Sequence, residues 1–450
     1  MGQEVLRRFT PQNDNITETS GAKPCWGYET RNVDSDALDN APVGITRTSP
    51  RGWAILLLFR AQGSSVILVS YTFGLFLPFI SDDLGITPLE AGLLQGVWWI
   101  TAAVLALPSG AWLSRIRPIP LVLASLLLGV PFLFLQGLAN SFLLLFLARF
   151  LFVAFHTITV PARTLLLQQW VSPKQYATVN SVGLSQHSIM LAVAVSTSAL
   201  LITSLGSWRA AYFIMGGFFV LQTLLWPLIA RESKAPVISL QREVESQMGS
   251  PLRALKAFPQ AWLLAITMFS LSATWTAMVT FLPTLWLEER GVPLTLGGPL
   301  LGFLYYGLIP SGLLGGYLAR KVTKRKLLLW VPALLNTALG VAIVLTPWPL
   351  LLIPLISALG LVWVATPAMQ ILPFEFPGIT PREVAVVSSL VITFMGLGFA
   401  VGPVTTGAVA QWTGSIQTGL VVLCLGTVVG VVAGLFYPGQ SKAEEKLERN

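Results

Sequence analysis

The stretch PIPLVLASLLLGVPFLFLQG, residues 118–137, runs for twenty consecutive positions without a charged side chain. A helix that crosses the hydrocarbon core of a bilayer needs about 20 such residues. Pro131 would break a helix in water, whereas membrane helices tolerate proline because neighbouring groups satisfy the freed backbone. The stretch therefore predicts a membrane-spanning helix.

Eleven further apolar segments of similar length accompany this one. Together they form two sets of six, at about 53–80, 90–113, 118–137, 141–168, 177–204 and 209–230, then at about 260–284, 297–319, 327–346, 350–373, 383–410 and 415–437. A backbone in lipid must satisfy its own hydrogen bonds, so helices are the expected structure. We predict an all-α membrane protein with twelve transmembrane helices in two six-helix bundles.

The composition of the whole chain agrees with this prediction. Hydrophobic residues make up 54% and charged residues 11% of 450 residues, against roughly 25% charged in an ordinary soluble domain. The net charge of +8 indicates basic loops on one face of a membrane rather than nucleic-acid binding. Cys25 lies in a polar tail and Cys424 in an apolar segment, which argues against a disulfide framework or a cysteine zinc site. We expect no metal and no cofactor.

Basic residues also predict how the chain crosses the membrane. We expect a polar tail at 1–51, a first bundle at 52–231, a linker at 232–258, a second bundle at 259–437 and a tail at 438–450. With the N-terminus inside, the tails and inner loops hold 23 Lys and Arg and the outer loops hold two. This bias predicts that both termini are cytoplasmic in a multi-pass protein of the cell membrane (inner or plasma membrane).

The two predicted bundles share short sequences at corresponding places. Residues 110–115, GAWLSR, match residues 315–320, GGYLAR, at an offset of 205. Residues 172–181 match residues 380–389 at an offset of 208. Parallel repeats of six helices are typical of two similar bundles with a cavity between them that opens alternately to each side.

At these motifs the chain resembles the major facilitator superfamily, over about residues 52–437. The resemblance implies transport of a small solute by alternating access, without ATP, and gating roles for Gly110, Arg115, Gly315 and Arg320. The family usually has Asp before each of these arginines, where this chain has Ser114 and Ala319. Within the family, residues 373–385 and Gly398 to Pro403 resemble the cyanate and nitrate/nitrite-like porters.

Ionisable side chains inside the predicted helices are mainly basic. Arg149, His156 and Arg163 follow one another at intervals of seven residues, which places them along one face of a helix at steps of about 10 Å. The matching positions of the other half are apolar, and every carboxylate falls in a tail, a loop or a helix end. An ionisable group inside a membrane is costly and usually functional.

These cations suggest an anion path. Arg60 and Tyr71 share one face of the first predicted helix, and Trp275 and Gln370 are further candidates for substrate contact. Arginine can hold an oxyanion with two parallel hydrogen bonds. In the alternative interpretation Arg149 and Arg163 extend toward the two membrane surfaces, and His156 is a packing residue.

The sequence is compatible with more than one mode of energetic coupling and more than one class of function. Without a central carboxylate we expect facilitated movement, anion exchange with a counter-anion, or ion coupling through His156, whose reference pKa of about 6.5 suits a proton switch. Efflux of a lipophilic drug or metabolite and a transporter-like sensor remain alternatives. No nucleophile, base and orienting group occur together, so we predict no enzyme. We expect a monomer whose partners are a small-molecule substrate and the lipid bilayer, with no nucleic acid.

Overall fold

A computed structural model describes residues 48–113, 116–159, 162, 166–167, 170–171, 175–230 and 255–438. Most of the predicted tails, 1–51 and 438–450, and of the predicted linker, 232–258, lies outside the described residues. Within the described part, all regular secondary structure is helical. The prediction of an all-α membrane fold is therefore confirmed.

The first bundle consists of seven described helices. They are α2 (Pro50–Tyr71), α3 (Phe73–Leu84), α4 (Pro88–Leu113), α5 (Pro118–Gly137), α6 (Phe142–Thr157), α8 (Tyr176–Leu205) and α9 (Trp208–Ile229). The first predicted segment is divided at Thr72 into α2 and α3. The fourth was predicted over 141–168, but α6 ends at Thr157. Pro161 has no N–H to offer the carbonyl of Thr157, which explains an end at this point.

The second bundle has two divided segments, the tenth and the twelfth, and the twelfth is divided at Thr427. Its elements are α12 (Gln260–Thr284), η2 (Leu285–Glu289), α13 (Leu294–Lys321), α14 (Leu327–Leu345), α15 (Pro349–Leu361), η3 (Val362–Ala365), α16 (Thr366–Ile371), η4 (Leu372–Glu375), α17 (Pro381–Thr413), α18 (Ile416–Gly426) and α19 (Val428–Phe436). The tenth segment is broken because Pro367 and Pro373 interrupt the backbone hydrogen bonds, and two short 3₁₀ turns result.

Ten helical stretches in the described residues are long and apolar enough to cross a membrane. Two further predicted segments correspond to α6, a shorter apolar helix of 16 residues, and α13, with 28 residues. The multi-pass membrane class is thus confirmed. The count of twelve spans stays a prediction.

Local chemistry explains where the helices begin and end. Ser141, Ser207 and Ser415 each accept a hydrogen bond from a first-turn backbone N–H, and Thr380 forms a capping box with Glu383. Such caps satisfy N–H groups that have no partner inside the helix. At the other ends, glycines with positive φ such as Gly206 and Gly414 terminate α8 and α17.

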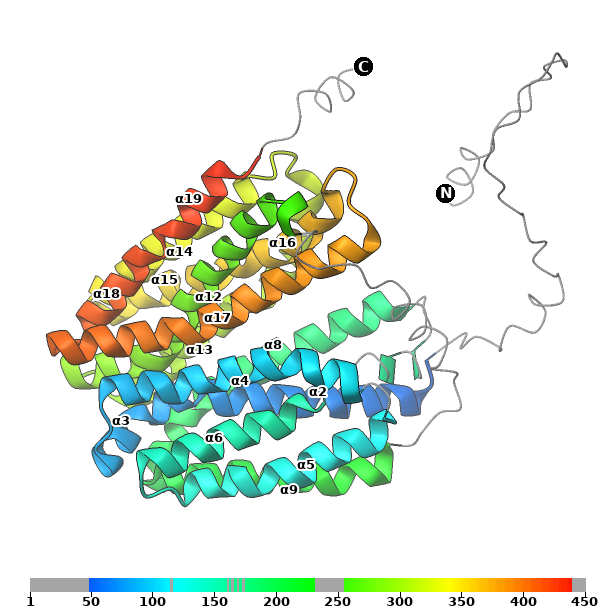
Figure 1. The fold of residues 1–450 in the computed structure, drawn as a ribbon. Coiled ribbons are helices and arrows are strands. Elements are labelled where there is room, and N and C mark those ends of the chain that lie inside the picture. The colour runs from blue at the N-terminus through cyan, green and yellow to red at the C-terminus, as the bar shows by residue number, and fades with distance from the viewer. Residues whose placement is uncertain are drawn as a thin grey trace, which may run out of the picture. The chain divides into compact units, whose positions relative to one another are not determined.

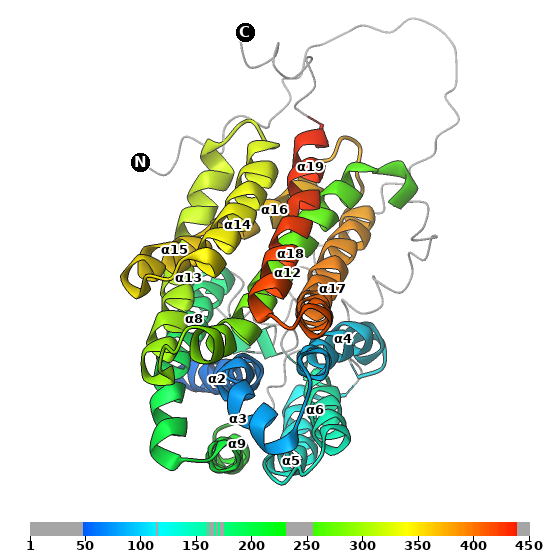
Figure 2. The ribbon, with the colours of Figure 1, turned by 90° about the vertical axis from the view of Figure 1, so that its left-hand side faces the viewer.

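The two bundles meet through three helix pairs. Helix α4 packs against α17, α8 against α13, and α3 against α12 (Figures 1 and 2). A Cβ on Gly92 would overlap the carbonyl of Pro403, and a Cβ on Gly407 would overlap that of Pro88. A Cβ on Gly302 would overlap the Oγ of Ser196. All three glycines lie in the halves of their helices next to the predicted outer loops, so backbone-close packing joins the bundles there.

Candidate functional site

A cavity of about 510 Å³ lies among the helices of the first bundle. It is lined by residues of α2, α4, α6 and α8 and by the turn after α6. Its polar and aromatic lining residues include Arg60, Ser64, Trp98, Trp99, His156 and His187. The cavity therefore carries one permanent cation and two imidazoles, and no carboxylate is among its described lining residues.

Arg60 enters the cavity from the middle of α2. The side chain is half-buried and lies against Gly183 of α8, where an added Cβ would come within 2.8 Å of Nε and 3.0 Å of Cζ. Gly183 therefore provides the space that the guanidinium occupies. Because α2 and α8 contact each other along this face, the position of Arg60 depends on the packing of two helices.

The two histidines are held in different ways. Ser64 Oγ lies 2.9 Å from His187 Nδ1 and also donates to the backbone carbonyl of Arg60 at 2.9 Å. His156 sits near the end of α6, where its carbonyl accepts from the N–H of Thr159 at 3.0 Å and from its hydroxyl at 2.8 Å. The His156 side chain lines the cavity at this turn.

An aromatic cluster continues from the cavity wall into the second bundle. Trp99 lines the cavity, and its ring lies 4.4 Å from Phe399 and 5.9 Å from Tyr71. Tyr71 in turn lies 5.5 Å from Tyr305, which lies 5.6 Å from Trp275. The cluster thus brings together two predicted site residues, Tyr71 and Trp275, at the junction of the bundles.

Two polar groups of this cluster are buried without a partner in the described structure. They are the indole N–H of Trp99 and the hydroxyl of Tyr305. An unpartnered buried donor costs about 1–3 kcal/mol. Trp99 is half-buried at the cavity wall, but its indole nitrogen is itself buried, so the ring rather than the N–H faces the cavity.

Arg149 occupies a closed site of its own. Its side chain is fully buried, and it donates to Leu94 O at 3.0 Å, Tyr212 Oη at 3.2 Å and Gln95 Oε1 at 3.1 Å. Its guanidinium also stacks on Phe73, 4.2 Å from the ring centroid. Arg149 is not among the residues that line the cavity. The predicted stripe therefore does not face a single space, since His156 lines the cavity and Arg149 does not.

The remaining predicted residues are spread over the chain. Gln370 is exposed on α16, and Arg163 and Arg115 lie outside the described residues. Gly110 belongs to α4 and Arg320 to α13. Gly315 packs against η3, because a Cβ there would overlap the carbonyl of Val364.

Sequence reasoning missed Ser64, Trp99 and Gly183. Trp99 directly follows Trp98, and the paired tryptophans within a charge-free stretch were an available signal. Ser64 and Gly183 gave no signal, because their roles depend on what α2 and α8 place opposite them.

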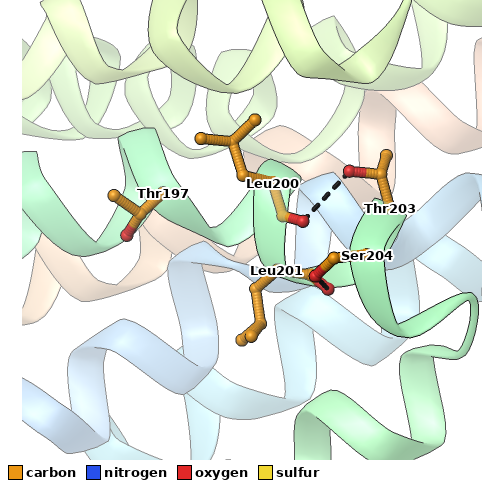
Figure 3. Close-up of a pocket in the computed structure, with 5 residues that line it drawn as sticks. All are labelled: Thr197, Leu200, Leu201, Thr203 and Ser204. Atoms are coloured by element: carbon orange, nitrogen blue, oxygen red, sulfur yellow. Dashed lines mark hydrogen bonds between the residues drawn. The ribbon is translucent and has the colours of Figure 1, made fainter.

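A second hollow lies on the surface of α8 and lacks convergent groups. Figure 3 shows its lining side chains, all from one helix. The Thr203 hydroxyl donates to Leu200 O at 3.0 Å and the Ser204 hydroxyl to Leu201 O at 2.9 Å. Both hydroxyls are thus used within their own helix, and this hollow is a weaker candidate than the cavity at Arg60.

Comparison with known proteins decides the family. A family model described as Major Facilitator Superfamily matches residues 62–380, more than half of the chain. The chain belongs to the major facilitator superfamily. The resemblance inferred from the repeated motifs is confirmed. The narrower resemblance to cyanate and nitrate/nitrite-like porters stays a prediction.

Two curated relatives of the superfamily are similar in sequence. The "Uncharacterized transporter YybO" of Bacillus subtilis (strain 168) is 25% identical over 289 residues, covering 57% of this chain. The "Probable sulfoacetate transporter SauU" of Cupriavidus necator is 24% identical over 261 residues, covering 55% of this chain. The matches span 64% and 60% of these relatives' own lengths.

Solved structures share the fold at low identity. A bacterial homologue of the human lysosomal transporter Spinster, in an inward-facing and unoccupied conformation, has a TM-score of 0.71 and 17% identity, covering 87% of this chain and 97% of that one. The nucleoside transporter NupG has a TM-score of 0.64 and 15% identity, covering 86% and 97%. These likenesses support the superfamily fold.

Proposed function

We propose that this chain is a secondary transporter that moves a small anion across the cell membrane by alternating access. The observation that carries the proposal is the cavity in the first bundle, where Arg60 and two histidines converge and no described lining residue is acidic. A fixed cation in a low-dielectric cavity attracts anions and repels cations. The proposed cargo carries a carboxylate, sulfonate or nitrate-like group.

The roles of the residues follow from their surroundings. Arg60 provides the permanent charge and the paired donors for an oxyanion. His156 supplies a further polar contact at the same cavity. Arg149 acts as a positioning residue, because its donors are already bound to α4 and α9.

The other predicted residues are proposed to act away from the cavity at Arg60. Tyr71 and Trp275 close the path between the bundles through the aromatic cluster. Arg163 and Gln370 are proposed to meet the anion in another state of the transport cycle. Gly110, Arg115, Gly315 and Arg320 are proposed to gate the inner side, as the family motif implies.

One relative supports the choice of an anion. It is named as a probable sulfoacetate transporter, and sulfoacetate is an organic anion. Because the two chains are only 24% identical over part of their lengths, the relative's name favours a chemical class of substrate, the organic anions, rather than a particular molecule. The relative's name and the charge of the cavity agree.

The orientation and the transport cycle complete the proposal. With both termini cytoplasmic, the close contacts of α4 with α17 and α8 with α13 lie toward the outside. The described state is then closed outside, and the cycle opens these contacts while the inner ends approach. We propose that the protein works as a monomer by facilitated movement or anion exchange, with proton coupling through His156 as the alternative.

Counterflow in proteoliposomes tests this function. Wild-type protein is loaded with a panel of carboxylates, sulfonates and nitrate, and with cationic and neutral lipophilic compounds. We expect exchange of at least one anion, with loss of that exchange in Arg60→Gln/His156→Ala. Arg117→Gln removes an exposed charge outside the cavity and should leave exchange unchanged. Anion exchange at the wild-type rate in the double variant would contradict the proposed site.

The aromatic cluster favours a competing function, efflux of a lipophilic compound. Apolar and aromatic walls bind such compounds without help from a fixed charge. The same panel distinguishes the two functions, since efflux of neutral or cationic dyes that is indifferent to Arg60→Gln would favour this alternative. Ligand-induced thermal stabilisation with no counterflow at all would instead favour a sensor.

A further inference from the structure

A second large cavity lies in the second bundle, at its periphery. It has a volume of about 520 Å³ and is bordered by α13, α14, α15 and η3. Every residue that lines it is apolar, including Val322, Leu327, Leu335, Leu339, Ala358 and Ala365. Leu335 and Leu361 on its border are 46% and 38% exposed, so the groove opens toward the surface that lipid covers.

The groove has the length of one leaflet. Its lining residues on α14 extend from Leu327 to Leu339, which is about 18 Å of helix at ~1.5 Å per residue. Half of the hydrocarbon core of a bilayer is about 15 Å thick. The groove therefore runs from one membrane surface to about the midplane, parallel to a lipid chain.

The surface end of the groove is strongly basic. Three exposed lysines lie here, beside the lining residues Val322 and Leu327: Lys321 ends α13, and Lys324 and Lys326 belong to the connection between α13 and α14. Lys321 donates to the Tyr317 hydroxyl at 2.8 Å. No ion pair is seen for Lys324 or Lys326 among the described residues, and the first turn of α14 has no side-chain cap. The first-turn N–H groups of Leu327, Leu328 and Leu329 are already bound to backbone carbonyls, so an anion at this point would meet the lysine charge and the positive end of the helix dipole.

The nearby acidic group is already neutralised. Glu375 accepts two hydrogen bonds from Arg325, from Nε and from one terminal nitrogen, each at 2.7 Å. Because the Glu375 carboxylate is paired with Arg325, it does not cancel the charge of the neighbouring lysines. The groove thus combines an apolar channel of leaflet length with a net positive mouth.

We propose that this groove binds an anionic phospholipid, with one acyl chain along α14 and the headgroup phosphate at Lys324 and Lys326. The connection between α13 and α14 is predicted to face the cytoplasm, where anionic lipids attract basic clusters. Basic pockets between transmembrane helices on that side recognise acidic headgroups. The proposal is independent of the anion that the first bundle transports.

Lipid retention by the full-length protein tests the site. Detergent-purified protein is mixed with phosphatidylglycerol or phosphatidylcholine, and bound lipid is counted by native mass spectrometry. Each lysine near the headgroup contributes about a five-fold preference. We expect Lys324→Ser/Lys326→Ser to lower the preference for phosphatidylglycerol roughly 25-fold. Arg117→Ser/Lys256→Ser removes the same charge from other exposed inner positions and should retain the preference.

A second variant probes the apolar part of the site. Ala358→Phe fills the groove and leaves the lysines in place. We expect it to lower retention of phosphatidylglycerol at least five-fold, and we expect glycerol phosphate, which lacks acyl chains, not to compete. Equal retention in wild type and in both variants would overturn the proposal, as would a loss as large in the control double variant. Competition by glycerol phosphate would show a phosphate site without a lipid and would also overturn it.

Discussion

Two arginines inside the first bundle, Arg149 and Arg60, have different surroundings. Arg149 has three hydrogen-bond acceptors and an aromatic face around it and is fully buried. Arg60 is half-buried and borders an open cavity. The difference teaches that an intramembrane cation marks a ligand site only where a space is left beside it. A saturated guanidinium instead joins helices, here α6 to α3, α4 and α9.

The largest effect expected from this comparison is a loss of stability in Arg149→Gln. The shorter amide cannot reach Leu94, Gln95 and Tyr212 together, and each buried group left unpaired costs about 1–3 kcal/mol. We expect the free energy of unfolding to fall by about 3 kcal/mol, measured by thermal or denaturant unfolding in detergent. The folded fraction should bind a transported anion within two-fold of wild type. If Arg149→Gln kept wild-type stability but lost anion binding, Arg149 rather than Arg60 would be the anion-binding residue.

Arg60→Gln is expected to show the opposite profile. Charge-assisted hydrogen bonds contribute about 1.5–3 kcal/mol, so the dissociation constant of the anion should rise roughly 10- to 100-fold. The melting temperature without ligand should change little, because Arg60 is not enclosed as Arg149 is. Isothermal titration or ligand-dependent thermal shift measures both quantities on one sample. Arg60→Lys separates charge from geometry and should recover only part of the affinity.

A smaller effect is expected when Arg60 is displaced rather than removed. Gly183→Ala places a methyl group where the guanidinium lies, and the flexible side chain can move away without unfolding the protein. We expect a two- to five-fold loss of anion affinity. Gly63→Ala is the matched control, since Gly63 lines the same cavity and its added Cβ would meet nothing within 4 Å. Equal affinity in Gly183→Ala and wild type would indicate that the position of Arg60 does not matter.

The smallest effect concerns a third arginine, at the predicted outer surface. Arg209 pairs with Asp83 and donates to Ala139 O at 3.0 Å, and Trp208 donates to the same carboxylate at 3.0 Å. Both members of the pair are partly exposed, and such pairs contribute about 0–1 kcal/mol. Asp83→Asn should therefore lower the free energy of unfolding by less than about 1 kcal/mol. A loss as large as that of Arg149→Gln would remove the distinction between enclosed and exposed cations.

Most of the fold could be predicted because composition and helix-end chemistry are local. The predicted segments 118–137 and 260–284 coincide with α5 and α12, and 90–113 differs from α4 by two residues. Two deviations occur at prolines, at the end of α6 before Pro161 and in the tenth segment, whereas the first and twelfth segments are divided at Thr72 and Thr427. An uninterrupted helix was assumed there from hydropathy alone, which does not register a missing N–H.

The candidate site was harder to predict because it depends on neighbours far away in the sequence. The seven-residue spacing correctly placed Arg149 and His156 on one helix, α6. It could not indicate that Tyr212, 63 residues later, accepts a hydrogen bond from Arg149. Nor could it indicate that Gly183 makes room for Arg60. Spacing gives the face of a helix, whereas the surrounding helices decide whether that face meets protein or space.

The glycine contacts between α4 and α17 and between α8 and α13 have a consequence for manipulation of the molecule. At Gly92 and Gly407 an added Cβ would meet the backbone of the facing helix, and at Gly302 it would meet the Ser196 side chain, so a single methyl group acts as a wedge. Alanine at one of these positions would bias the resting population away from the described arrangement while leaving the cargo chamber chemically unaltered. Substitution of these glycines thus offers a way to trap a second conformation, in which the contacts between the bundles are open.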